Sequence, residues 1–328
     1  MSITNKILTI LEENQGESIS GETLAETLGV SRSAVWKSIK SLRQEGHEIQ
    51  AITNKGYCLS SQSDMISAEG IQKYLSDDLK KLPLYVHKTI DSTNEEAKRM
   101  ALDKEPHGTT ILARHQSQGK GRLGRTFISP ANTGIYISIL LKPNFDIRHA
   151  VLTTTAASVA VVRAIKKVCH ENAQIKWVND IYLNQKKVCG ILTEAITDFE
   201  TGQIQYLILG IGINCDTHDF DSDLIKIAGA LPKGFSKNHL AAEVIGQTLN
   251  LMDHIEDRYF IKEYKESSLI LGEKITVHKG GYKEGIPGVP AIATDIDENG
   301  CLEIVYDNGE TETLNSGEIS IRLQGSEK

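Results

Sequence analysis

The chain has 328 residues, and its 36 lysines and arginines against 43 aspartates and glutamates give a net charge of −7 at neutral pH. This length predicts two or three domains, each with a core of its own. The acidic balance excludes a protein whose whole surface binds nucleic acid through bulk charge, so any such contact must be local. A hydrophobic content of 40% and a charged content of 24% are typical of an ordinary globular protein.

The sequence indicates a cytoplasmic protein without a structural metal. Acidic residues interrupt the N-terminus before any long apolar run, so it does not resemble a secretory signal. The most apolar long stretch, residues 151–168, contains three threonines, an arginine and two lysines and is too polar to span a membrane. The five cysteines form no CxxC pair and the histidines form no HxxxH pair, so we assign no residue to a metal or to a disulfide framework.

The first segment contains a helix-turn-helix pattern. Leu24, Ala25 and Leu28 share one helical face, and Gly29 supplies a left-handed stop. Ser31 is placed to cap a second helix, which runs to residue 44 and carries four cations and no acid. The runs 47–53 and 57–59 flank a tight turn and predict a two-stranded wing.

We expect the second helix to enter the major groove of DNA. Short polar side chains at its start suit phosphates and base edges, and the cations suit phosphates. The residues expected to contact DNA are Ser31, Arg32, Ser33, Lys37, Lys40 and Lys55. The alternative is a small helical docking module whose basic face is only solvated.

A polar run at residues 60–64 ends the first segment, and the chain that follows it divides into two parts. Strand-like runs lie at 109–113, 135–141, 187–196 and 206–213. Helix-like segments without internal proline lie at 94–102, 150–168 and 239–265. This mixture predicts an α+β domain with a mixed sheet, followed by short alternating runs between glycine turns that predict a small all-β domain. We expect domains at 1–63, 64–270 and 271–328.

The glycine-rich loop HQSQGKGRLGR at residues 115–125 carries the strongest chemical signal. Three glycines free its backbone while Lys120, Arg122 and Arg125 bring three positive charges, which suits an anion. The β-branched and aromatic residues that follow leave no helix to hold phosphate, so we reject the Rossmann and P-loop interpretations. The alternatives are a solvated surface loop and a lid that a nucleotide or acyl-phosphate orders.

Two further polar clusters stand out. Ser92, Thr93 and Asn94 form a polar turn at the start of a helix, where capping would explain only one of them. The run KWVND at 176–180 precedes a strand that Lys187 enters among apolar neighbours. A solvated lysine and a turn aspartate at Asp180 are the plain alternatives. No GxSxG motif is present, so a covalent enzyme intermediate is not indicated.

In chain order these motifs resemble those of the bifunctional biotin–protein ligases that also act as biotin operon repressors. The resemblance covers essentially the whole chain and rests on these segments: GETLAETLGVSRSAVWKSIKSL, DSTN, HQSQGKGRLGR, KWVNDIYL, KKVCGILTE, LGIGINC and the β-rich tail. It implies an α+β protein with an N-terminal winged helix-turn-helix, a central mixed α/β ligase domain and a C-terminal SH3-like β-barrel.

The resemblance also implies a reaction. The biotin carboxylate attacks the α-phosphate of Mg²⁺-ATP, pyrophosphate leaves, and a lysine of the biotin carboxyl carrier domain of a carboxylase attacks the resulting biotinyl-5′-AMP. By matching positions, biotin or the adenylate would contact Ser92, Thr93, Asn94, Gln116, Lys120, Gly121, Arg122, Asp180 and Lys187. Arg122 and Lys187 would be catalytic, because fixed cations stabilise a phosphoryl transition state. Asn214 is a candidate nucleotide contact.

The same resemblance implies that the adenylate acts as corepressor and favours a homodimer on operator DNA. Two positions depart from the family pattern: Lys120 replaces an arginine, which alters retention of the adenylate, and Val178 replaces a proline, which loosens the turn before Asp180. The alternative functions are a non-catalytic repressor that senses a small ligand and a lipoate–protein ligase. Lys187 beside an intact cationic loop argues against the first, and the N-terminal module argues against the second.

Overall fold

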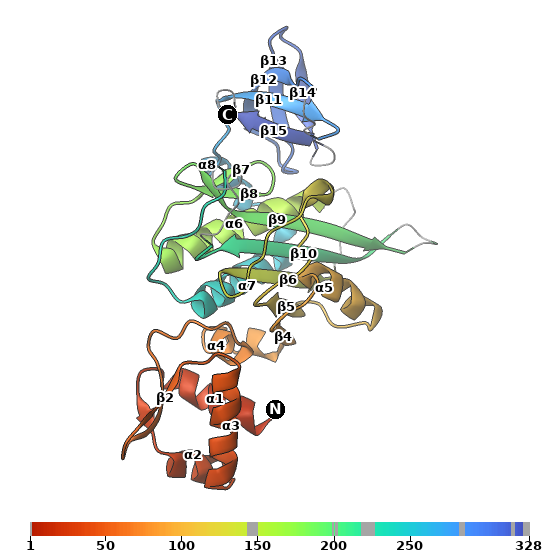
Figure 1. Cartoon of the computed structure of the whole chain (residues 1–328). Coiled ribbons are helices and arrows are strands. Elements are labelled where there is room, and N and C mark those ends of the chain that lie inside the picture. The colour runs from red at the N-terminus through yellow and green to blue at the C-terminus, as the bar shows by residue number, and fades with distance from the viewer. Residues whose placement is uncertain are drawn as a thin grey trace.

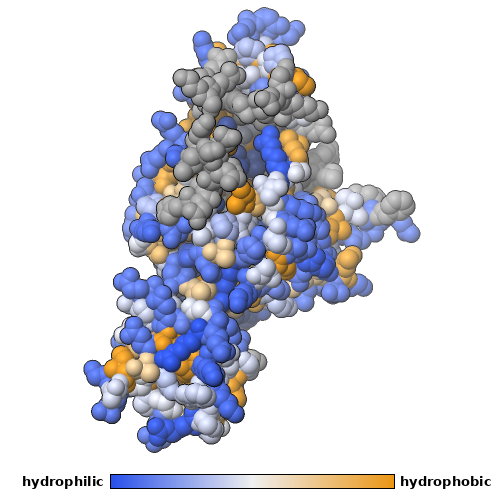
Figure 2. Space-filling model, viewed as in Figure 1, coloured by the Kyte–Doolittle hydropathy of each residue, from blue (hydrophilic) through white to orange (hydrophobic). Residues whose placement is uncertain are grey.

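Three regions follow one another along the chain, from N-terminal helices through a large central sheet to a C-terminal β domain (Figure 1). The computed structural model describes residues 2–142, 150–198, 200, 203–217, 227–281, 286–315 and 319–323. Within these ranges no helix is both long and apolar enough to cross a membrane. On the face drawn in Figure 2, apolar residues lie in small groups among polar ones.

The N-terminal region is the expected winged helix-turn-helix. Its helices are α1 (Ile3–Glu13), α2 (Gly21–Leu28) and α3 (Arg32–Gln44), and its strands are β1 (Ser18–Ile19), β2 (Ile49–Ile52) and β3 (Gly56–Leu59), in the order β1-β3-β2. The Oγ of Ser31 accepts the backbone N–H of Ala34 at 3.2 Å, and Gly29 has φ of 63°, so both expected helix boundaries are confirmed. Leu24, Val35 and Ile39 are buried in a core of this region's own.

The connection to the central region is held in place rather than loose. It consists of residues 60–67 and the short helix α4 (Ala68–Gln72). The backbone N–H of Lys237 donates to Oδ1 of Asp64 at 2.7 Å, and the side chain of Asn238 bonds the backbones of Met65 and Ser67. The first turn of the helix that begins at Lys237, far along the sequence, therefore fixes the path of this segment.

The central sheet has seven strands in the order β4-β5-β6-β10-β9-β8-β7. Their bounds are β4 (Leu84–His87), β5 (Thr110–Ala113), β6 (Gly134–Leu141), β7 (Gln174–Lys176), β8 (Asp180–Leu183), β9 (Lys186–Thr197) and β10 (Ile204–Asn214). Among the described strands of this sheet, β4 and β5 pair in parallel and the other neighbours pair antiparallel, so the sheet is mixed as expected. All four predicted strand runs are strands.

Helices cover both faces of this sheet. They are α5 (Thr93–Leu102), α6 (Ala150–Cys169), α7 (Lys237–Asp253) and α8 (Phe260–Glu266), with 3₁₀ turns at Leu79–Lys81, Arg122–Gly124 and Ile255–Asp257. Ala97 of α5 packs with Ile208 on one face, whereas Leu207 and Leu209 belong to the larger core under α6 and α7. Successive side chains of β10 point to opposite faces of the sheet, so this strand contributes to the core on each side.

One helix prediction was wrong. The pattern at 239–265 predicts one continuous helix, but α7 ends at Asp253 and α8 begins at Phe260. Arg258 between them has φ of 55°, in the left-handed region that interrupts a helix. The break lets Phe260 and Tyr264 become fully buried, and no proline or glycine in the sequence marks it.

The C-terminal domain is all-β, as expected. Its strands are β11 (Lys274–Lys279), β12 (Val289–Ile296), β13 (Leu302–Tyr306), β14 (Thr311–Leu314) and β15 (Ile319–Leu323), in the antiparallel order β14-β13-β12-β11-β15. The turn before Gly300 meets the central region, where the indole Nε1 of Trp177 donates to the carbonyl of Gly300 at 3.0 Å.

Candidate functional site

The first half of the site lies where β5 and α5 meet. Ser92 is the N-cap residue of α5, yet within this described helix its hydroxyl makes no capping hydrogen bond. The backbone N–H and the hydroxyl of Thr93 both donate to Oε1 of Gln116, at 2.8 and 3.1 Å. Gln116 in turn donates to the hydroxyl of Ser129 at 2.8 Å. The structure thus joins the DSTN turn to the start of the glycine-rich loop.

Two residues that the sequence reasoning missed complete this cluster. The hydroxyl of Ser138, on β6, lies within hydrogen-bond distance of both Oδ1 of Asn94, at 2.5 Å, and Oγ1 of Thr93, at 2.8 Å. Glu194, on β9, accepts the amide of Asn94 at 2.8 Å. Ser138 is fully buried in an otherwise apolar strand, and a polar residue at such a position is the signal that identifies it.

A row of glycines connects this cluster to the second half of the site. A Cβ placed on Gly210 would lie 2.2 Å from Oδ1 of Asn94, and one on Gly212 would lie 2.5 Å from the ring of Phe127. Gly190, paired with Gly212 across the ladder, would meet Nζ of Lys187 at 3.2 Å. Glycine inside a strand marks a close approach of another group. These three therefore form a floor between Asn94 and Lys187.

The second half of the site is a charged group on the β8–β9 hairpin. Nζ of Lys187 lies 2.6 Å from Oδ1 of Asp180, and both side chains are about one-quarter to one-third exposed. Nη1 of Arg122 donates to Oδ1 of Asn179 at 3.0 Å. Burial lowers the pKa of the Arg122 guanidinium from its usual value, while the charge of Asp180 acts in the opposite direction. The hairpin and the loop thus place two cations beside one carboxylate.

A cavity of about 120 Å³ adjoins Arg122. Its other lining residues are Thr154, Val178, Ile191, Thr193, Ala195 and Leu207. Four apolar side chains and two threonines line it, and the cation at its edge favours a ligand that carries a negative charge.

The turn that we expected Val178 to loosen is held from three sides. Val178 is buried, and its carbonyl accepts the hydroxyls of Tyr264 at 3.1 Å and Ser158 at 3.3 Å. Burial raises the pKa of Tyr264 well above its usual value, so its hydroxyl stays protonated as a donor. On the far side of the turn, Nδ2 of Asn179 donates to the carbonyl of Ile191 at 2.8 Å.

The cationic loop has defined contacts within the described chain. Nζ of Lys120, one of the two departures from the family pattern, donates to Oε1 of Glu95 on α5 at 2.6 Å. This hydrogen bond, together with that from Lys98, lowers the pKa of Glu95. The N–H of Gly121 donates to the carbonyl of Arg125 at 2.7 Å and closes the loop on itself. Lys120 and Gly121 thus lie near the start of α5, whereas Arg122 lies at the β8–β9 hairpin.

Asn214 ends β10, and its side chain has a structural contact. Its Nδ2 donates to the carbonyl of Gly229 at 3.0 Å, and it is buried. The backbone N–H of Lys187 donates to the carbonyl of Ile227 at 2.8 Å. Asn214 therefore holds the segment that also pairs with the backbone of Lys187.

All six residues expected to contact DNA are exposed: Ser31, Arg32, Ser33, Lys37, Lys40 and Lys55. Trp36 is 54% exposed on the same helix, and Nζ of Lys40 lies 5.5 Å from its ring centroid. Arg43 behaves differently, because its Nε donates to the carbonyl of Ile49 in the wing at 2.7 Å. The basic surface of α3 is therefore formed by residues in its first two-thirds.

Three parts of the chain match known protein families. Residues 86–214 match the biotin/lipoate A/B protein ligase family, residues 4–58 match an HTH domain, and residues 288–322 match the biotin protein ligase C-terminal domain. The bifunctional ligase/repressor BirA of Bacillus subtilis is 34% identical over 250 residues, which cover 76% of each chain. The BirA of Escherichia coli is 27% identical over 327 residues, covering 97% of this chain and 96% of the relative.

A solved structure has the same fold over about three-quarters of this chain. The biotin protein ligase of Aquifex aeolicus, in complex with biotin and ATP, superposes with a TM-score of 0.62 and 26% identity. The match covers 74% of this chain and 99% of that one. The three domain matches and the 34% identity agree with one another, so the chain belongs to the family of bifunctional biotin ligase/repressors.

Proposed function

We propose that this protein attaches biotin to one lysine of a biotin carboxyl carrier domain through biotinyl-5′-AMP, and represses transcription with that adenylate as corepressor. Family membership supports the two activities, ligation and repression. The observation that carries the ligase half is the pair of cations, Arg122 and Lys187, at one edge of the glycine floor. We further propose domain boundaries after residues 63 and 270.

In the proposed site, Ser92, Thr93, Asn94 and Gln116 bind the polar ring of biotin. The Thr93–Gln116 and Asn94–Ser138 hydrogen bonds orient these groups before the ligand arrives, which lowers the entropic cost of binding. The glycine floor supports the rest of the molecule because it carries no side chains to obstruct it. The biotin carboxylate then points toward Lys187.

The chemistry requires stabilisation of negative charge at the α-phosphate. When the carboxylate oxygen bonds to phosphorus, pyrophosphate leaves with the electrons of the broken P–O bond. Lys187 and Arg122 are held by Asp180 and Asn179 respectively, so their charges need little reorganisation as the transition state forms. In the second step the acceptor lysine supplies the nucleophile and AMP leaves. Lys120 and Gly121 belong to the loop that closes over the adenylate.

We propose that Mg²⁺ enters with ATP. Magnesium in nucleotide sites takes most of its ligands from phosphate oxygens and water, with at most one or two carboxylates. Among the described residues, no group of three or more histidine, cysteine, aspartate or glutamate side chains is placed to hold a metal. We assign no residue to it. Asn214 remains a proposed nucleotide contact.

The DNA-binding half rests on α3. Its N-terminal end presents the N-cap Ser31 with Arg32 and Ser33, and Lys37 and Lys40 follow about one and two turns later. We propose that a homodimer, favoured by the adenylate, places two such helices on an operator, with Lys55 of the wing on a phosphate. The protein would work in the cytoplasm, where operator and carrier domain are both within reach.

The test is a ligation reaction with the purified protein, biotin, Mg²⁺-ATP and a biotin carrier domain. Mass spectrometry is expected to show a biotin-sized increment on a single carrier lysine. A matched reaction with lipoate in place of biotin is expected to give no increment. Tight biotin binding without any increment would instead indicate a sensing repressor, and modification by lipoate alone would indicate a lipoate ligase.

A further inference from the structure

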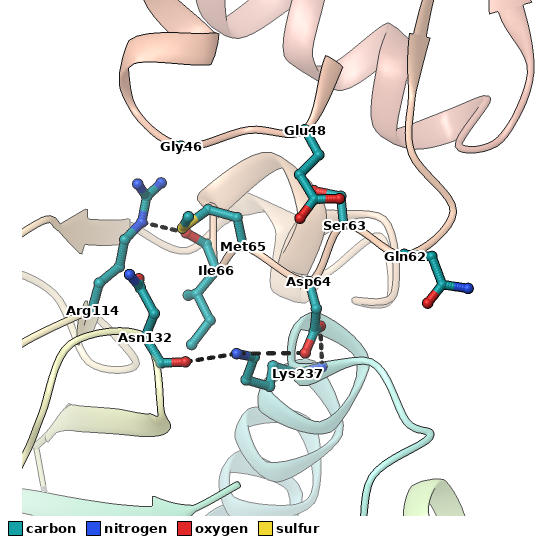
Figure 3. Close-up of a pocket in the computed structure, with 10 residues that line it drawn as sticks. All are labelled: Gly46, Glu48, Gln62, Ser63, Asp64, Met65, Ile66, Arg114, Asn132 and Lys237. Carbon is teal, nitrogen blue, oxygen red and sulfur yellow. Dashed lines mark hydrogen bonds and ion pairs between the residues drawn. The ribbon is translucent and has the colours of Figure 1, made fainter. Parts of the chain in front are cut away.

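Arg114 connects β5 with the DNA-binding region. This strand leads to the residues proposed to bind biotin, Ser92, Thr93, Asn94 and Gln116, which we call the biotin cluster. Arg114 directly follows β5, and its backbone N–H donates to the carbonyl of His87 at 2.9 Å, so its main chain continues the sheet. Two residues later the chain reaches Gln116, the partner of Thr93. The side chain of Arg114 points out of the central region, toward Gly46 of the N-terminal region (Figure 3).

The guanidinium of Arg114 holds two carbonyls at once, one at the end of α3 and one in the connecting segment. Its Nε donates to the carbonyl of Ile66 at 2.8 Å, and its Nη1 donates to the carbonyl of Glu45 at 3.0 Å. Glu45 is the C-cap residue of α3. The last carbonyls of a helix have no partner within it and form the negative end of its dipole, so a cation there is stabilising. Arg114 thus holds the C-terminus of the recognition helix.

The bond from Arg114 to the end of α3 matters for the orientation of this helix because a cavity lies beside it. A cavity of about 210 Å³ lies beside Arg114, between the end of α3, the connecting segment and the central region (Figure 3). Lys237 also lines this cavity: its Nζ donates to the carbonyl of Asn132 at 2.8 Å and lies 3.6 Å from Oδ2 of Asp64. Here the two regions meet through polar contacts around a space rather than through close apolar packing.

Arginine is suited to this position and lysine is not. The planar guanidinium presents N–H donors in fixed directions, so it can hold two carbonyls that belong to different segments. An ammonium group at the same place would keep the charge but lose the fixed geometry. The positions of the Glu45 and Ile66 carbonyls relative to each other therefore depend on the guanidinium that bonds both.

We propose that Arg114 is a positioning residue that transmits occupancy of the biotin cluster to the recognition helix. Ligand bound at Thr93 and Gln116 fixes the chain that follows β5, and Arg114 thereby fixes the end of α3 in the orientation that binds operator DNA. This inference rests on the proposed corepressor function and assigns one residue to its transmission. It predicts that ligand-dependent DNA affinity and ligation separate when Arg114 is changed.

The test compares the wild type with Arg114→Lys and Arg114→Gln, and uses Arg163→Lys as a matched control, because Arg163 pairs with Glu263 inside the central region. The probe is a duplex selected from a random-sequence pool by the wild-type protein with biotin and Mg²⁺-ATP. DNA affinity is measured for each protein with and without biotin and Mg²⁺-ATP. Biotin ligation kinetics, the ligand-dependent dimer fraction by sedimentation and the Tm are measured in parallel.

In both Arg114 variants we expect the gain in DNA affinity on adding ligand to fall at least about tenfold, which corresponds to about 1.4 kcal/mol. We expect kcat and the KM for biotin to stay within about twofold of the wild type, and the dimer fraction to be unchanged. An unchanged gain would overturn the inference, as would a parallel loss of ligation or of dimer. A wild-type protein without any gain would overturn the corepressor function itself.

Discussion

Arg122 and Asn179 are joined by a 3.0 Å hydrogen bond from Nη1 to Oδ1. Because Nδ2 of Asn179 also donates to the carbonyl of Ile191 on β9, the cationic loop is tied to the sheet through one amide side chain. A loop that only covered the surface would not need such a contact. The arrangement explains how a glycine-rich segment can hold a positive charge in a fixed place.

Arg122→Gly is therefore expected to speed the release of biotinyl-5′-AMP. Loss of one hydrogen bond from a charged group costs about 1.5–3 kcal/mol, which corresponds to about a 10- to 150-fold faster dissociation. Release of labelled adenylate after rapid dilution measures it. Arg125→Gly is the matched control, since Arg125 is exposed in the same loop. Equal release rates in the two variants would remove Arg122 from the adenylate site.

Lys187→Ala is expected to slow adenylate formation by about two to three orders of magnitude, the usual cost of losing one fixed group that stabilises transition-state charge. Pyrophosphate release in the presence of biotin and ATP reports this step. Lys186→Ala is the control, because Lys186 is the exposed neighbour on the same strand. If both variants react at the wild-type rate, Lys187 only pairs with Asp180 and has no role in the chemistry.

The sequence was sufficient to predict the order of domains and most of the secondary structure, but not the contacts between segments. Gly29 and Ser31 could be assigned their positions because their effects are local, through φ and a capping hydrogen bond. Ser138, Glu194 and Phe127 were missed because they reach the site only through strand pairing and the packing of a loop on a sheet. For the same reason, the sequence did not reveal that the side chain of Arg114 crosses to another region.

Lys40→Ala is expected to weaken operator binding several-fold without altering biotin ligation. A lysine on a phosphate releases about one counterion, so the slope of log affinity against log salt is expected to fall by about one. Titration of labelled operator at several salt concentrations measures both effects. Lys262→Ala, whose side chain is 84% exposed in the central region, is the control. Simultaneous loss of DNA binding and ligation in Lys40→Ala would mean that the two functions are not separable.

Glu12 predicts a pH dependence of stability at the junction of the N-terminal and central regions. Burial raises the pKa of Glu12 to about 7, and Lys73, whose charge acts against this shift, donates to the backbone carbonyl of Glu12 rather than to its carboxylate. Because the folded pKa exceeds the unfolded one, the folded protein binds more protons between about pH 4.5 and 7. The contribution of Glu12 to the free energy of unfolding therefore falls as pH rises through that window.

Glu12→Gln removes this dependence while keeping the shape of the side chain. The stability of Glu12→Gln relative to the wild type is expected to grow from pH 5 to pH 7.5 and then level off, at no more than about 3 kcal/mol. Urea unfolding followed by circular dichroism at each pH measures it. Glu13→Gln is the control, since Glu13 is the exposed neighbour. A constant difference across this range would show that Glu12 is already ionised in the folded protein at pH 5.

The glycine floor leads to a prediction about biotin itself. A methyl group at position 210 would lie 2.2 Å from Oδ1 of Asn94, whose side chain is held by Ser138 and Glu194 and is buried. Asn94 cannot move away without breaking those hydrogen bonds, so Gly210→Ala is expected to raise the KM for biotin at least about tenfold and to cost about 1–3 kcal/mol of stability. The KM for ATP is expected to change little.

The control is Gly246→Ala on α7, where the added methyl group would meet only Leu79 at an ordinary 3.6 Å and where alanine favours the helix. The double variant Gly210→Ala with Asn94→Ala separates the clash from a general loss of packing. If the clash with Asn94 is the cause, the double variant regains stability relative to Gly210→Ala but not biotin affinity, because the amide that binds the ligand is gone. An unchanged KM for biotin in Gly210→Ala would place the biotin ring elsewhere than beside Asn94.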